Sequence, residues 1–119
     1  MGRMMNRWFA PCFVRSAKEP LDDEYVLLEP ANRHGNLFMA SVFVGDSQIT
    51  PITRFPVQLD STRDFDSLKD GLKRFVDVSA VKWYYVHPMT PRRHTEFDFE
   101  KLDEVVSRVK FAQAVLWLR

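Results

Sequence analysis

The residues best suited to chemistry in this sequence lie between His87 and Thr95. The stretch HPMTPRRHT holds two prolines, two adjacent arginines and two histidines. An arginine guanidinium offers paired, planar N–H donors that match a phosphate or a carboxylate, and a histidine exchanges a proton near neutral pH. A site for a small anionic or phosphorylated ligand would therefore use Arg92 and Arg93 to hold the anion, with His87 or His94 transferring protons.

The same stretch has a simpler interpretation, which we favour. It is a solvated connection just before a helix, and its arginines meet nearby carboxylates such as Glu96 and Asp98. No glycine-rich phosphate loop or dinucleotide-binding motif accompanies it. The sequence thus singles out no catalytic residue and leaves open whether the protein is an enzyme.

Metal and nucleophile chemistry have little support in the sequence. His87, His94, Glu96 and Asp98 offer imidazole and carboxylate ligands, but their spacing matches no recurrent metal motif. The only cysteine, Cys12, lies in an apolar run, so neither an internal disulfide nor a multi-cysteine zinc site can form. We therefore expect no bound metal and no cofactor.

Large aromatic residues are the second distinctive feature. Phe, Trp and Tyr make up 13% of the chain, which excludes intrinsic disorder. The chain has more large aromatic side chains than two short helices can cover. These predict an interface made by Trp8, Trp83, Tyr84, Tyr85 and Trp117. The leading prediction is a non-enzymatic protein-interaction module of accessory, inhibitor or immunity type. It would act through an exposed aromatic sheet face or edge and bind another protein or itself, as a homo-oligomer.

Composition narrows the remaining classes. A length of 119 residues, with 45% hydrophobic and 28% charged, predicts a single globular domain over residues 1–119, with a flexible amino terminus over residues 1–6. A net charge of +1 argues against nucleic-acid binding. The sequence has no apolar run typical of a signal peptide or a membrane span, so we expect a cytoplasmic protein without membrane contact.

Strand signals dominate the first half of the chain. Two apolar runs, 25–29 and 37–44, are separated by a loop containing His34-Gly35-Asn36, which predicts an antiparallel hairpin. Residues 7–15 and 49–59 contain prolines, which are tolerated at sheet edges, so each is expected to be an edge strand or a bulged one.

Helical periodicity dominates the second half. Ser61 and Asp64 form a helix-starting pattern, and apolar residues recur from Phe65 to Val76 at spacings that place them on one face. Gly71 in this helix is expected to permit a close backbone approach. Residues 81–87 are rich in β-branched and aromatic residues and predict a central strand.

A second helix is expected from Asp98 or slightly earlier, continuing through the tail 112–119 as helix rather than strand. The sum is an α+β fold. A small antiparallel sheet of about four to five strands carries two amphipathic helices on one face, in the order ββββαβα.

Overall fold

The computed structural model describes residues 24–44 and 50–118 of the chain. The predicted edge strand at 7–15, with Trp8 and Cys12, and the amino terminus at 1–6 lie outside the described residues. The structure is built from these elements in chain order: β1 (Glu24–Pro30), β2 (Leu37–Val44), β3 (Thr53–Gln58), α2 (Thr62–Leu72), β4 (Lys82–Val86), β5 (His94–Phe97), the 3-10 turn η3 (Phe99–Lys101) and α3 (Leu102–Trp117).

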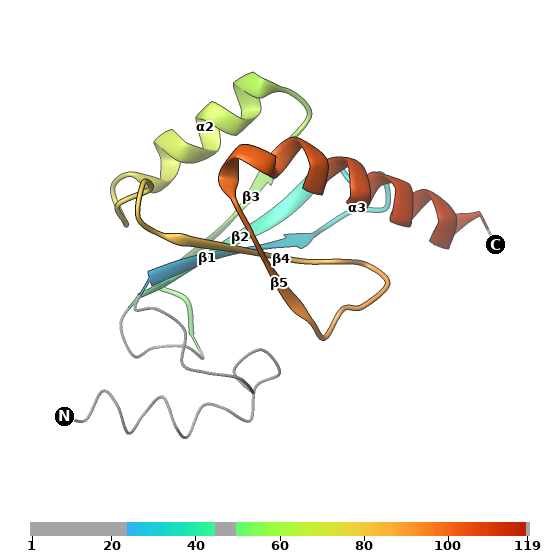
Figure 1. Ribbon diagram of the computed structural model, residues 1–119, viewed down its shortest axis with the longest axis horizontal. Helices are drawn as coiled ribbons and strands as arrows, with labels where there is room; N and C mark the ends of the chain where they lie inside the picture. Colours follow the sequence, from blue (N-terminus) through green and yellow to red (C-terminus); the bar gives the residue numbers. More distant parts are fainter. Residues whose placement is uncertain (1–23, 45–49, 119) are drawn as a thin grey trace.

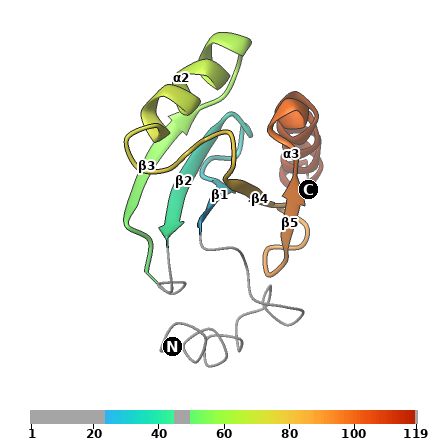
Figure 2. The same cartoon turned by 60° about the vertical axis from the view of Figure 1, so that its left-hand side comes forward.

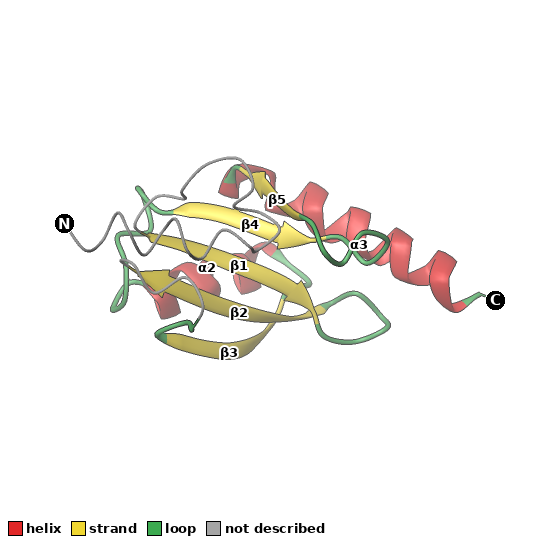
Figure 3. Cartoon of the chain, turned by 90° about the horizontal axis from the view of Figure 1, so that it is seen from below, coloured by secondary structure: helices red, strands yellow, loops and turns green. Residues whose placement is uncertain are grey.

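The strands form one five-stranded sheet in the order β3-β2-β1-β4-β5. Neighbouring strands are antiparallel except for β1 and β4, which run parallel with Val26 opposite Trp83. Figures 1 and 3 show the resulting arrangement, with β1 at the centre and β3 and β5 at the edges. Pro56 lies in edge strand β3, as expected for a residue that lacks a ladder donor.

Both helices cover the same face of the sheet, so the predicted α+β class with two helices on one face is confirmed (Figure 2). The helices contribute Leu68, Leu72, Leu102 and Val109 to the main core, where each side chain is almost fully buried. They pack on side chains that point up from the central strands: Val26, Leu28, Phe38, Ala40, Val42, Trp83 and Tyr85. Successive strand residues point to opposite faces, so only alternate residues of each strand reach this core.

The opposite face of the sheet carries a second apolar cluster: Tyr25, Leu27, Phe43, Tyr84 and Val86. Tyr25 stacks on Phe43 with ring centroids 4.7 Å apart and meets Tyr84 edge-on at 5.5 Å. Salt bridges lie at its margins, between Arg54 and Glu29 at 3.7 Å and between Lys82 and Glu96 at 3.3 Å. The central strands are therefore apolar on both faces.

The start of α2 and the end of α3 agree with the predictions. Ser61 is the N-cap of α2, and its Oγ accepts a hydrogen bond from the Asp64 backbone N–H at 3.4 Å. The Asp64 carboxylate reaches back to the backbone N–H of Asp60 at 2.7 Å. The tail is helical through Trp117, as expected. Regular helix in α2 ends at Leu72, and Phe75 and Val76 follow in turns that keep Val76 buried.

Three expectations were wrong. The segment 94–97 is a fifth strand instead of a loop, and β1 pairs with β4 in parallel in a sheet expected to be antiparallel. Gly71 does not mediate a close approach, because a Cβ there would meet no atom within 4 Å. The close approach occurs at Gly35, whose φ is +79° and whose Cβ position lies 2.8 Å from the Cα of Lys110.

Candidate functional site

The sheet topology opens a groove at the carboxyl ends of β1 and β4. The chain leaves β1 toward β2, on one side, and leaves β4 toward β5, on the other, so the two connections diverge. Divergence of this kind creates a crevice beyond the ends of parallel strands. Here it is a groove of about 670 Å³, closed on its third side by the end of α3. Its apolar lining comes from Pro30, Ala31, Val86, Pro88, Pro91, Leu116 and Trp117.

The loop between β1 and β2 is held firmly against α3. The Oδ1 of Asn32 accepts hydrogen bonds from the backbone N–H groups of Gly35 and Leu37, at 3.0 and 3.2 Å. The Nε2 of Gln113 donates to the backbone carbonyl of Asn32 at 2.8 Å, and Gly35 is buried against Lys110. These contacts fix the loop that presents Arg33 to the groove.

Asp60 links β3, the β1–β2 loop and α3. Its carboxylate accepts hydrogen bonds from Gln58 at 2.6 Å and Asn36 at 3.3 Å, and it lies 3.6 Å from the ammonium of Lys110. The Gln58 hydrogen bond, with smaller contributions from Asn36 and Lys110, lowers the pKa of Asp60 below its ordinary value, although desolvation opposes the shift. The charged carboxylate therefore helps to bind β3, the β1–β2 loop and α3 together.

Two charged residues line the groove. Glu29 is partnered by Arg54 at 3.7 Å. Arg33 lies with its guanidinium carbon 5.0 Å from the centre of the Trp117 ring, in a cation–π contact. Arg33 makes no ion pair within residues 24–44 and 50–118. Among the residues that the structure describes, the groove therefore has apolar walls and one cationic group, Arg33, without a carboxylate partner.

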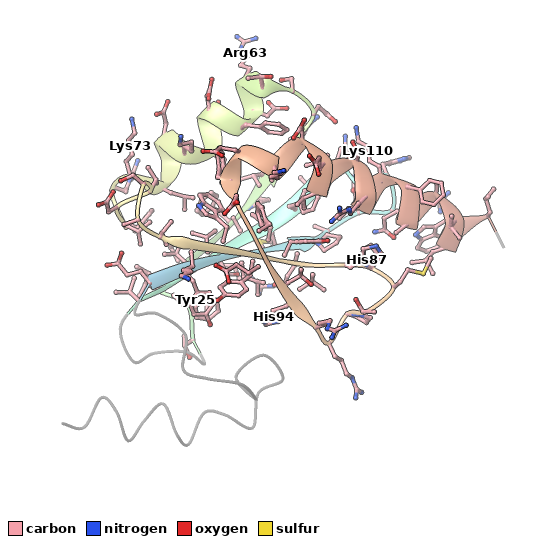
Figure 4. The ribbon with its side chains drawn as sticks, viewed as in Figure 1. Tyr25, Arg63, Lys73, His87, His94 and Lys110 are labelled. Carbon is pink, nitrogen blue, oxygen red and sulfur yellow. The ribbon has the colours of Figure 1, made fainter. Side chains whose placement is uncertain are left out.

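The predicted ligand residues of the His87–His94 stretch do not converge. The connection is a pair of turns, with Thr90 N–H donating to the His87 carbonyl at 2.9 Å and Arg93 N–H donating to the Thr90 carbonyl at 3.0 Å. His87 lies on the α3 side, and its Nδ1 accepts from the Met89 N–H at 3.0 Å. His94 pairs with Val86 of the second cluster and lies on the other side of the sheet (Figure 4). Because the two histidines lie on opposite sides of the sheet, a ligand in one pocket cannot contact both of them.

Arg92 and Arg93 are exposed and border a separate hollow of about 480 Å³, together with Thr90 and Pro91. Neither histidine lines this hollow, and neither arginine lines the larger groove. From the His87–His94 stretch, Pro88 and Pro91 line the groove. The anion-binding role of the two arginines stays a prediction.

The predicted interface residues have different environments. Trp83 and Tyr85 are buried in the main core, and Tyr84 is buried in the second cluster, so these rings are not at the surface. Burial of these three rings gives no support to an exposed aromatic sheet face, and the interface stays a prediction. Trp117 is 59% exposed at the end of α3, and Trp8 lies outside the described residues.

An exposed apolar surface exists elsewhere, at the end of α3. Phe111 is 73% exposed and Leu118 is 82% exposed, with Val115 between them on the same face of the helix. Figures 1 and 3 show this end of α3 extending past the strands. Sequence reasoning missed these residues, although their spacing of four and three positions is that of one helix face.

No known protein family, curated protein or solved structure matches this chain. Within the part of the chain that the structure describes, no group of three or more His, Cys, Asp or Glu side chains lies close enough to hold a metal ion. No helix among these residues has the length and apolarity needed to cross a membrane.

Proposed function

We propose that the protein is an interaction module that pairs with a second copy of itself through the end of α3. A single observation carries this proposal: an apolar stripe made by Phe111, Val115 and Leu118 faces away from the core. An α-helix turns about 100° per residue, so these residues lie about 180–240° around the axis from buried Val109. A helix that is apolar on opposite faces is usually covered on both.

The spacing of the stripe favours another helix as its cover. Apolar residues four and three positions apart repeat as they do along the seam of a coiled coil. A second copy supplies an identical stripe, and a two-fold axis is the commonest way to bury such a surface. Because the stripe spans only one heptad, we expect a weak dimer with a dissociation constant on the order of 10–100 μM.

Analytical ultracentrifugation over a range from about 5 to 500 μM tests the proposal. The wild-type mass should rise from the monomer value of 14.0 kDa toward twice that value. Phe111→Glu should associate much more weakly than the wild type at every concentration, because a carboxylate buried within the stripe has no partner. A large aromatic ring buried at an interface contributes on the order of 2 kcal/mol, so dimerisation should weaken at least about thirtyfold.

Ile52→Glu is the matched control. Ile52 is half exposed and apolar, but its backbone bonds to Val42, at the end of the sheet opposite to the groove. This variant should self-associate like the wild type. A wild-type protein that remains monomeric at 500 μM, or equal association of Phe111→Glu and wild type, would refute pairing through α3.

A further inference from the structure

We infer that the groove beyond β1 and β4 is a binding site for a small aromatic carboxylate, with Arg33 as the group that recognises its charge. This goes beyond the proposed self-association, which uses the outward stripe of α3. The groove volume of about 670 Å³ falls within the range of small-molecule sites. The site lies where the two chain connections diverge, so a ligand can enter without displacing a strand.

The apolar part of the ligand is defined by the groove walls. Pro30, Pro88 and Pro91 present rigid, apolar ring surfaces, and Val86 lies at the end of β4. Trp117 is 59% exposed, so the part of its indole that Arg33 does not cover can contact a flat ring. Walls of this composition favour a planar aromatic body over a flexible polar one.

The charged part of the ligand is defined by Arg33 and Glu29. The carboxylate of Glu29 is paired with Arg54 at 3.7 Å, whereas Arg33 faces only the ring of Trp117. A guanidinium in a cation–π contact still has N–H donors, which can form two parallel hydrogen bonds to a carboxylate. Glu29 already has Arg54 as its partner, so among the described residues the Arg33 guanidinium is the charged group of the lining that complements one anionic group attached to an apolar ring.

The hydrogen bonds of the β1–β2 loop support a site formed in advance. The side-chain oxygen of Asn32 and the amide of Gln113 are already used to hold the loop on α3. Arg33 follows Asn32 directly, so its backbone position is set before a ligand arrives. Preorganisation of this kind lowers the entropy cost of binding.

The probes are 2-naphthoate and its neutral analogue 2-naphthylmethanol, titrated into 15N-labelled protein and followed by NMR. We expect naphthoate to bind at least about tenfold more tightly than the alcohol, the low end for hydrogen bonds to a charged group. Shifts should concentrate at the groove, including the amides of Arg33 and Trp117. Arg33→Gln should reduce the preference for naphthoate to less than about twofold, and Trp117→Ala should weaken both probes.

Arg63→Gln is the matched control, since Arg63 is an exposed arginine in the first turn of α2, far from the groove (Figure 4). It should retain the tenfold preference. The thermal midpoint of Arg33→Gln should match that of the wild type, because Arg33 is exposed and makes no contact with the core. Equal affinity for the two probes, an unchanged preference in Arg33→Gln, or shifts confined to Phe111 and Leu118 would overturn the inference.

Discussion

Gly35 gives the sharpest test of how the loop and α3 fit together. Its φ of +79° is a backbone conformation that an L-residue adopts at a cost of about 1–2 kcal/mol. A Cβ at this position would lie 2.8 Å from the Lys110 Cα and 3.1 Å from its Cγ, whereas carbon atoms pack well at about 3.5–4.0 Å. The Lys110 Cα is a backbone atom and cannot rotate away, so the helix or the loop must move.

The expected loss in Gly35→Ala follows from these two effects. Overpacking adds about 1–3 kcal/mol to the backbone term, so the free energy of unfolding should fall by about 2–5 kcal/mol. For a domain of this size about 3–6 °C of thermal midpoint corresponds to 1 kcal/mol. Circular dichroism at 222 nm should therefore show a midpoint at least about 6 °C below that of the wild type.

Gly71→Ala is the internal control for the same substitution. Gly71 lies within α2, and a Cβ there meets no atom within 4 Å. Replacing a helical glycine by alanine should raise stability by about 0.5–1 kcal/mol. A midpoint for Gly35→Ala within about 2 °C of the wild type would refute the fit of the loop on α3. The same outcome would remove the reason for a preformed groove.

Two further predictions concern the segment that links β3 to α2. Folding lowers the pKa of Asp60, so its ionised form stabilises the protein above the unfolded value of 3.8, and this stabilisation is lost as the pH falls through the folded value. The difference in thermal midpoint between wild type and Asp60→Asn should therefore be present at pH 6 and shrink as the pH falls below 3.8; a constant difference would contradict this role. Ser61→Ala should lower the free energy of unfolding by about 0.5–1 kcal/mol in a urea titration, at the low end for caps because the bond is 3.4 Å long. An unchanged urea midpoint would show that the cap contributes nothing.

Local signals sufficed for much of the fold. The apolar spacing of Leu68 and Leu72, the Ser61 cap and the hairpin loop ending at Asn36 depend on residues within a few positions of one another. Helix periodicity and turn preference act over this range. The layer arrangement followed because two amphipathic helices and one sheet have few ways to bury their apolar faces together.

The fifth strand could not be read from its own residues. His94–Phe97 is four residues long and has no alternating apolar pattern, so its conformation depends on pairing with β4. The parallel pairing of β1 with β4 joins segments more than 50 positions apart. Chain distances of this kind are bridged by packing of the whole domain, which no local pattern encodes.

The sequence alone determined that the large aromatic residues would need extensive cover, and its local patterns located two helices and the strands at 25–29, 37–44 and 81–87. Only the tertiary structure decided which rings are covered. Trp83 and Tyr85 are buried beneath the helices, whereas Phe111 is exposed on the outward face of α3 and Trp117 is exposed where α3 extends past the strands. Burial depends on which groups lie opposite a side chain in the folded protein. The groove residues Arg33 and Trp117 are likewise brought together only by the packing of the β1–β2 loop against α3.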